Sequence, residues 1–167
     1  MDVSFERKDQ KDEWLTPPHV LQALGEFDLD PCSPINRPWD TAKMHLTTAD
    51  DGLAKSWHGR VFCNPPYGTQ TKYWLDRCAE HGNAIALVFA RTETRMFFDS
   101  VWQKADAIFF IKGRLSFYTV KGEKGGTAGA PSVLVAYGKD NVECLRNLKL
   151  NGCFVDLSTR IIAKNAS

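Results

Sequence analysis

Apolar runs recur along this chain and alternate with stretches in which apolar and polar residues mix at helical spacing. This pattern predicts an α/β fold rather than a succession of hairpins. Residues 84–90 are apolar throughout, as expected of a central strand that is covered on both faces. We predict the other strands at residues 27–30, 43–47, 60–63, 107–111 and 132–137.

Three helices are expected between these strands. Thr16 precedes two prolines, which are tolerated in the first turn of a helix. We therefore predict a helix with Thr16 as its N-cap that runs to Gly25. Residues 71–81 predict a second helix, closed by Gly82, and Thr92 predicts the cap of a third that reaches Gln103. Residues 113–130 contain five glycines and predict a loop between the last two strands.

The chain of 167 residues has the usual size of one domain. We find no internal repeat and no linker, so we expect a single domain over residues 1–167, with a flexible tail at residues 1–12 and no separate target-recognition domain. A net charge of +1 means that nucleic-acid binding would need a local basic surface.

Cysteine usage and hydropathy exclude several classes of protein. The five cysteines are scattered, without a Cys-x-x-Cys pair, which argues against a disulfide framework and a zinc site and fits a reducing cytosol. We therefore expect no metal and a cytoplasmic location. The longest apolar stretches, 84–90 and 105–111, are too short to cross a bilayer, so no membrane partner is expected.

The most informative segment is Asn64-Pro65-Pro66-Tyr67, which directly follows the apolar strand 60–63. Each proline fixes φ at about −65° and has no N–H, so the backbone is extended with its carbonyls free to accept hydrogen bonds. The Asn64 amide oxygen and the Pro65 carbonyl can then both accept from one exocyclic NH₂ group. Tyr67 supplies an aromatic face on which a base can stack. These four residues therefore predict a catalytic receptor for a planar amine.

Together with residues 27–33 and 14–17, this tetrad resembles the phage-type DNA N-6-adenine methyltransferases over about residues 13–138. The resemblance implies methyl transfer from S-adenosylmethionine to adenine N6 in DNA, with S-adenosylhomocysteine as product. It also implies a bacterial or phage-infected host cell, with a role in restriction-modification or viral self-protection. Asn or Asp at the first tetrad position goes mainly with adenine in the families that the chain resembles.

The fold implied is a shortened Rossmann-like class I methyltransferase fold, with a mostly parallel central sheet flanked by helices. Only about thirty residues separate Asp30 from Asn64, where a full fold places two strand–helix units. Both residues end predicted strands. They are expected to face one cleft, since ligands bind beyond the carboxyl ends of strands in open α/β sheets.

The first strand carries the expected cofactor contacts. The Asp30 carboxylate can hold the ammonium of the cofactor's methionine part, and Pro31 and Cys32 would lie beside the nucleoside. Relatives usually carry a glycine-rich turn here, whereas this chain has Cys32, Ser33 and Pro34.

Two further segments complete the cofactor site implied by the resemblance. Trp14, Thr16 and Pro17 would contact the amino-acid end of the cofactor. Asp50 or Asp51 would bond its adenine amine, and the sequence does not decide between them. Asn64 of the tetrad is also expected to contact the cofactor.

A base inside duplex DNA cannot reach such a pocket, so the target adenine would have to flip out and stack on Tyr67. The DNA phosphates then need basic partners. The candidates are Arg91, Arg95, Lys112, Arg114, Lys121 and Lys124.

Two other functions remain open. Asn-Pro-Pro-Tyr also occurs in enzymes that methylate RNA adenine or a protein glutamine, although this chain lacks their extra N-terminal helical domain or RNA-binding module. The second is a nucleic-acid-binding relative that has lost the reaction. The altered segment at Cys32 is its best support.

Overall fold

The computed structural model describes residues 13–165, so the predicted tail at residues 1–12 lies outside the described residues. A seven-stranded sheet forms the centre, in the order β2-β1-β3-β4-β8-β5-β9. Its strands are β1 (Leu29–Asp30), β2 (Met44–His45), β3 (Val61–Cys63), β4 (Ala84–Phe89), β5 (Ala107–Ile111), β8 (Ser132–Tyr137) and β9 (Gly152–Asp156). A separate hairpin contains β6 (Ser116–Tyr118) and β7 (Lys124–Thr127).

The sheet is mixed, which corrects the prediction of a mostly parallel one. The neighbours among β2, β1, β3 and β4 are parallel, whereas β8 is antiparallel to both β4 and β5, and β9 is antiparallel to β5. The chain returns from β5 to β8 through the glycine-rich hairpin, and antiparallel strands need no crossover helix. The resulting α/β architecture is consistent with a methyltransferase-like fold.

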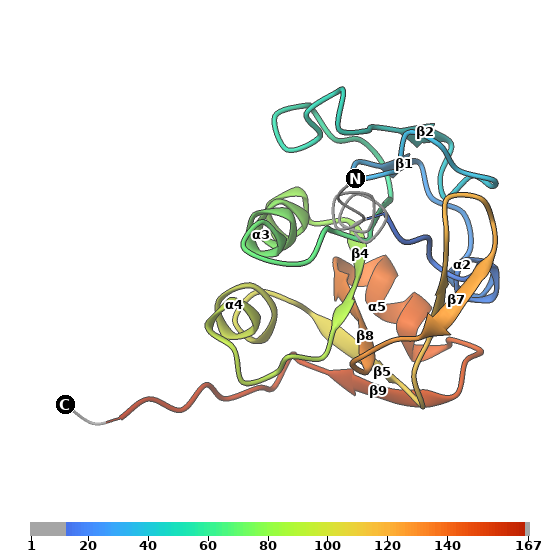
Figure 1. The fold of residues 1–167 in the computed structure, drawn as a ribbon. Helices are drawn as coiled ribbons and strands as arrows, with labels where there is room; N and C mark the ends of the chain where they lie inside the picture. The colour runs from blue at the N-terminus through green and yellow to red at the C-terminus, as the bar shows by residue number, and fades with distance from the viewer. Residues whose placement is uncertain (1–12, 166–167) are drawn as a thin grey trace, which may run out of the picture.

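Helices cover both faces of the sheet (Figure 1). The helix α3 (Thr71–His81), the short α4 (Arg95–Phe97) and the π-helix η1 (Phe98–Trp102) pack on one face, and α2 (Pro18–Leu24) and α5 (Lys139–Arg146) on the other. Two hydrophobic cores lie on opposite faces of the sheet, and alternate residues of β4 pack into each. Ala86 and Val88 pack toward α3, and Ile85 and Leu87 pack toward α2. Burial on both sides explains why this strand is apolar throughout.

Several predicted elements are confirmed. The helix Thr71–His81 ends at Gly82, whose φ of +76° is the left-handed conformation that glycine adopts without strain. The strands Ala107–Ile111 and Ser132–Tyr137 have the predicted bounds. The sequence did not predict α5 or β9.

Both predicted N-caps are wrong. The first helix begins at Pro18, with Pro17 at the cap position and no side-chain cap bond. In the third helix the cap is Thr94, whose hydroxyl accepts from the Phe97 amide at 3.2 Å, while the Thr92 carbonyl accepts from the Trp102 indole at 3.0 Å. Within residues 13–165 no helix is both long and apolar enough to span a membrane.

Candidate active site

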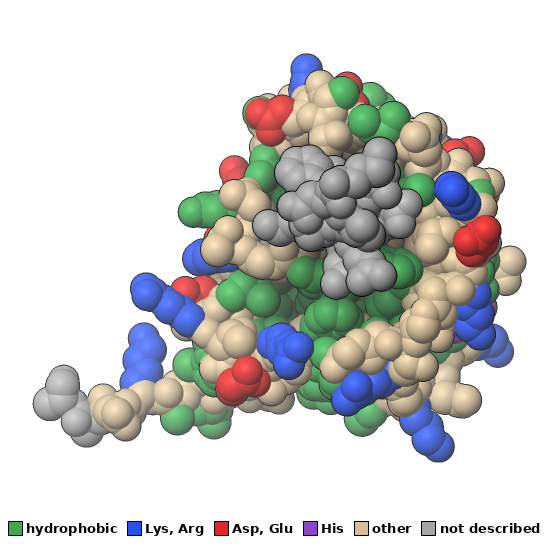
Figure 2. Space-filling view, in the orientation of Figure 1, with side chains coloured by type: hydrophobic (Ala, Val, Ile, Leu, Met, Phe, Trp, Pro, Cys, Tyr) green, Lys and Arg blue, Asp and Glu red, His purple; other side chains and the backbone are tan. Residues whose placement is uncertain are grey.

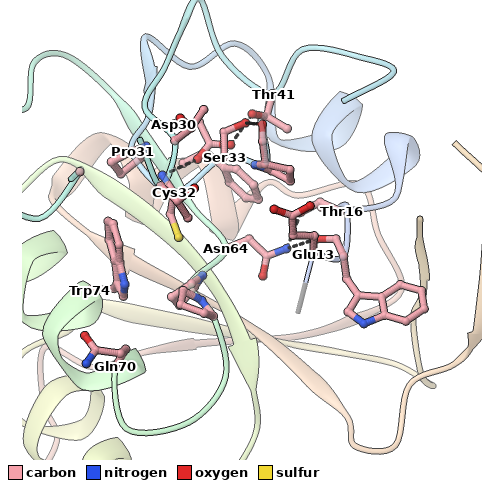
Figure 3. Close-up of a pocket in the computed structure, with 18 of the residues that line it drawn as sticks. Glu13, Thr16, Asp30, Pro31, Cys32, Ser33, Thr41, Asn64, Gln70 and Trp74 are labelled. Atoms are coloured by element: carbon pink, nitrogen blue, oxygen red, sulfur yellow. Dashed lines mark hydrogen bonds between the residues drawn. The ribbon is translucent and has the colours of Figure 1, made fainter. Parts of the chain in front are cut away.

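A cavity of about 380 Å³ lies beyond the carboxyl ends of β1 and β3 (Figure 3). Its volume falls in the range of small-molecule sites. The lining comes from the opening segment, the turns that follow β1 and β3, the loop before Trp57, and α3. Of the predicted site residues it contains Trp14, Thr16, Asp30, Pro31, Cys32, Asp51, Asn64, Pro65, Pro66 and Tyr67, whereas Pro17 and Asp50 do not line it.

Asn64 is delivered to the cavity by the fully buried strand β3. Its amide nitrogen donates to the Thr16 hydroxyl at 3.2 Å and to the Trp14 carbonyl at 3.4 Å. In Figure 3 the nitrogen points toward Thr16 and the oxygen away from it. No donor among residues 13–165 reaches that oxygen, so it stays available as an acceptor.

The next acceptor along the chain is the Pro65 carbonyl, to which no group in the described part of the chain donates. The Pro66 carbonyl is different, because it accepts from the Thr71 hydroxyl at 2.6 Å and is thereby tied to the start of α3. Two neighbouring free acceptors therefore remain, Asn64 Oδ1 and the Pro65 oxygen. They match the two hydrogens of one amino group.

Tyr67 stacks on Phe89, the last residue of β4, with ring centroids 4.2 Å apart and planes 4° from parallel. Phe117 of β6 meets Phe89 edge-on at 6.5 Å. Tyr67 is still 45% exposed, and desolvation raises the pKa of its phenol to about 12, so the ring is neutral at physiological pH. Sequence reasoning missed Phe89. The available signal was a bulky aromatic residue at the end of the strand beside β3.

Asp30 is a buried carboxylate, only 3% exposed, at the floor of the cavity. It accepts from the Cys32 amide at 3.0 Å and from the Thr41 hydroxyl (Figure 3). Desolvation raises its pKa to about 6, although the bonds from Thr41 and Cys32 lower it. Thr41 had not been predicted as part of the site.

The structure separates the two candidate aspartates. Asp50 closes a local turn, because its carboxylate accepts from the Thr47 amide at 2.8 Å and from the Thr47 hydroxyl at 3.2 Å. Asp51 lines the cavity, with a φ of +52° that is uncommon outside glycine. A Cβ on the next residue, Gly52, would lie 2.0 Å from the Pro31 carbonyl oxygen, so only glycine fits there.

Two stacked tryptophans, Trp57 and Trp74, lie beside Gly52 at one end of the cavity. Trp74 of α3 lines the cavity and stacks on Trp57, with centroids 6.5 Å apart and an interplanar angle of 20°. The Trp57 indole donates to the Gly52 carbonyl at 2.8 Å, which fixes the loop against the two rings. Neither tryptophan was among the predicted site residues.

The six predicted DNA-binding residues do not share one surface feature. Lys112, Arg114 and Lys124 line a second cavity of about 340 Å³, together with His19 and Pro17. Lys121 is exposed near the hairpin turn and does not line it. Figure 2 shows Lys and Arg side chains along the side of the molecule where Figure 1 draws the hairpin.

The remaining two lie elsewhere. Arg91 follows β4, and Arg95 begins α4, where it is 95% exposed and lies 3.6 Å from the Asp99 carboxylate. Neither lines either cavity.

An α/β fold with a cavity beyond its parallel strands and a paired set of free acceptors indicates a group-transfer enzyme. The family model for DNA N-6-adenine-methyltransferase (Dam) matches residues 4–141, and the chain belongs to this family. Membership confirms the resemblance drawn from the sequence and implies methylation of adenine N6, with DNA as the substrate. Neither the curated proteins nor the solved structures gave a match. Within residues 13–165 no cluster of three or more His, Cys, Asp or Glu side chains is arranged to hold a metal ion.

Proposed function

We propose that the protein transfers the methyl group of S-adenosylmethionine to N6 of an adenine that flips out of duplex DNA into the main cavity. The observation that carries this proposal is the pair of free acceptors, Asn64 Oδ1 and the Pro65 carbonyl. A sheet in which the short β2 takes the place of two full strand–helix units supports a shortened Rossmann-like fold.

The residues of the cavity fit S-adenosylmethionine. Asp30 is a buried carboxylate with no ion-pair partner in the described part of the chain, which suits the ammonium of an amino acid. Gly52 lets its loop pack directly against the Pro31 carbonyl beside the cavity, and the Trp74 indole offers a flat apolar surface. We assign the bond to the cofactor's adenine amine to Asp51, because it lines the cavity and Asp50 does not. When bound, the cofactor supplies a sulfonium methyl group that is already electrophilic.

The protein must therefore improve the nucleophile. The lone pair of adenine N6 is delocalised into the ring, so the amine is a poor nucleophile until its nitrogen becomes pyramidal. Asn64 Oδ1 and the Pro65 carbonyl accept hydrogen bonds from the two N6 hydrogens and so favour a pyramidal nitrogen. They also stabilise the positive charge that grows on nitrogen, a preorganised effect worth several kcal/mol.

Base capture is assigned to Tyr67. Flipping a base costs a few kcal/mol, and stacking on an aromatic ring returns about 1–3 kcal/mol. Phe89 holds the Tyr67 ring from one side in a nearly parallel stack, so Tyr67 is preorganised and less entropy is lost when a base arrives.

We assign part of the DNA backbone to the second cavity. β5 runs in the same direction as β4, since both are antiparallel to β8, so Lys112 lies at the same edge of the sheet as the tetrad. No salt bridge to Lys112, Arg114 or Lys124 is found in residues 13–165, which leaves their charges for phosphates. Free thiols at all five cysteines support the cytoplasm of a bacterial or phage-infected cell as the setting. There the reaction would serve restriction-modification or viral self-protection.

A tritium transfer assay tests the proposal by offering duplex DNA, RNA and protein to the enzyme with labelled S-adenosylmethionine. Duplex DNA is expected to accept the label, whereas label in RNA adenine or protein glutamine would assign the same chemistry to another substrate. Calorimetry with sinefungin, an analogue of the cofactor, tests the cavity. Absence of binding at millimolar concentration would identify a nucleic-acid-binding module instead.

A further inference from the structure

We propose that Thr41, held in place by His45, is a positioning residue that keeps the Asp30 carboxylate charged and so able to bind the ammonium group of the cofactor. This inference rests on the proposed function, because it concerns the site that would hold S-adenosylmethionine. Neither Thr41 nor His45 belongs to the segments that carry the family resemblance.

The charge of Asp30 depends on its hydrogen bonds, because the residue is only 3% exposed and water solvates it poorly. Each carboxylate oxygen meets one donor: the Cys32 amide lies 3.0 Å from Oδ1, and the Thr41 hydroxyl bonds Oδ2 (Figure 3). An oxygen of an ionised carboxylate only accepts, so the Thr41 hydroxyl donates in this bond. The bond is stronger to the charged form than to the neutral acid, and it therefore favours ionisation.

At neutral pH, Asp30 is charged by a narrow margin. Desolvation raises its pKa to about 6, even though Thr41 and Cys32 donate to it. A hydrogen bond to a charged group is worth enough to move a titration midpoint by about one to two pH units. Without the Thr41 hydroxyl, a large part of the Asp30 population would therefore carry a proton at pH 7, and a neutral acid holds an ammonium group only weakly.

Other titratable groups lie around Asp30. They include carboxylates of the same cavity, a guanidinium of the loop that leads to Thr41, and two buried thiols: Glu13, Asp51, Arg37, Cys32 and Cys63. The guanidinium lowers the pKa of Asp30, and burial raises the pKa of both thiols, which stay neutral. The variants below leave all five groups in place, so their charges are common to every comparison.

His45 fixes the position of Thr41. It lies on β2 opposite Asp30 of β1. Its Nε2 atom accepts from the backbone amides of Thr41 and Ala42, at 3.1 and 3.3 Å. A backbone amide only donates, so Nε2 carries no proton and the neutral ring is protonated at Nδ1.

The surroundings of the His45 ring hold it neutral. Its side chain is only 6% exposed, so desolvation lowers its pKa, and Arg37 lowers it further. Asp40, 3.9 Å from Nε2, acts in the opposite direction, but its side chain is 79% exposed and water screens its charge. The ring therefore remains an acceptor at physiological pH, and Thr41 keeps its place.

The first test measures the protonation of Asp30 in the cofactor-free protein by carbon NMR of labelled aspartate carboxyl groups, with the Asp30 signal identified by its absence in Asp30→Asn. We expect a midpoint at a pH of about 6 in the wild type. Thr41→Val removes the hydroxyl at nearly constant shape and should raise the midpoint by about one to two pH units, whereas Thr41→Ser should restore it. Thr159→Val, at an exposed position that lines neither cavity, is the matched control. An unchanged midpoint in Thr41→Val would overturn the proposal.

Calorimetry with sinefungin at two pH values shows whether this charge serves binding. Thr41→Val should bind about 2- to 10-fold more weakly than wild type at pH 7 and close to wild type at pH 8.5, where Asp30 is ionised in both proteins. An equal loss at both pH values would make Thr41 a direct cofactor contact and refute the role in keeping the charge. Failure of the wild-type protein to bind at either pH would refute the cofactor site itself, and the NMR midpoints, measured without cofactor, distinguish the two failures.

The part played by His45 is tested with His45→Gln, which keeps an acceptor, and His45→Leu, which removes it. The leucine variant should raise the Asp30 midpoint as Thr41→Val does, and combining the two changes should add little, because both lose the same bond. Additive shifts would show that His45 does not act through Thr41. Nitrogen NMR of the wild-type imidazole decides if the leucine variant does not fold, since a proton on Nε2 at pH 7 would refute the role of His45.

Discussion

Two oxygen atoms from adjacent residues, Asn64 Oδ1 and the Pro65 carbonyl, carry the chemistry in this account. Replacing Asn64 by alanine removes one of them and leaves the backbone acceptor. We predict that Asn64→Ala lowers kcat about 100- to 1,000-fold, the usual loss when one preorganised group that stabilises transition-state charge is removed. Single-turnover kinetics with duplex DNA measure this loss directly.

The same variant should bind sinefungin within a few fold of wild type. Asn36→Ala is the matched control, since Asn36 is exposed and lines neither cavity. Turnover close to wild type in Asn64→Ala would remove that side chain from the mechanism.

The buried Asp30 carboxylate lowers the stability of the folded protein, and we propose that it binds the ammonium group of the cofactor. Its pKa is raised from 3.8 to about 6 by desolvation, so the folded state holds the proton more tightly than the unfolded state. Between these two pKa values the free energy of unfolding of the cofactor-free protein falls as pH rises. Above a pH of about 6 it has fallen by its full amount. A shift of about two units corresponds to at most roughly 3 kcal/mol.

We therefore predict that Asp30→Asn removes this pH dependence and raises the free energy of unfolding at pH 7 by about 1–2 kcal/mol, while sinefungin binds at least tenfold more weakly. Denaturant unfolding from pH 4 to 8 measures the first effect, and calorimetry the second. Asp140→Asn, at an exposed position of α5, serves as the control. A loss of stability at pH 7 with unchanged sinefungin affinity would contradict both roles.

The tetrad could be recognised from the sequence because its chemistry lies in four consecutive residues. Partners supplied by distant segments could not. Thr41 reaches Asp30 only because β1 and β2 pair side by side, and Phe89 reaches Tyr67 only because β3 and β4 are neighbours. The role of Thr16 was mistaken for the same reason. A hydroxyl before two prolines satisfies the local rule for a helix cap, but its bonding partner is forty-eight residues away.

Among the elements, the hairpin β6–β7 has the most specific consequence. With the end of β5 it presents Lys112, Arg114 and Lys124 around the second cavity. We predict that the double variant Lys112→Ala/Lys124→Ala weakens DNA binding at low salt and reduces the slope of log K against log salt by about 2, since each phosphate contact contributes about 0.9. Fluorescence anisotropy with a labelled duplex over a salt series gives the slope.

Lys139→Ala/Lys164→Ala is the matched control, because both lysines are exposed and line neither cavity. Equal slopes for the two double variants would show that the second cavity makes no phosphate contact.

Strands were predicted better than helix ends. A buried strand is defined by its own apolar run, so Ala107–Ile111 and Ser132–Tyr137 could be delimited from the sequence alone. Where a helix ends depends on which polar atoms are free to cap it. In the third helix the Trp102 indole donates to the Thr92 carbonyl, and the N-cap is Thr94 instead. The hairpin lies in a glycine-rich segment with little apolar patterning, so its pairing could not be derived locally.

For the molecule as a whole, the sequence predicted an α/β protein with its site at the carboxyl ends of the strands, but not the mixed sheet. Strand direction is set by the connections, and a glycine-rich loop and a crossover are hard to tell apart in a single sequence. The two faces of β4 are buried by different helices, so the sheet is held between two hydrophobic cores, one on each face. This rigid platform is what positions Asn64 and Tyr67.

The most direct test of the account is mass spectrometry of nucleosides from duplex DNA that has been incubated with the protein and methyl-deuterated S-adenosylmethionine. We predict deuterated N6-methyldeoxyadenosine with the wild-type protein and at least 100-fold less with Asn64→Ala. Label on cytosine N4, no labelled nucleoside, or equal labelling by the two proteins would contradict the claim that these acceptors activate adenine N6.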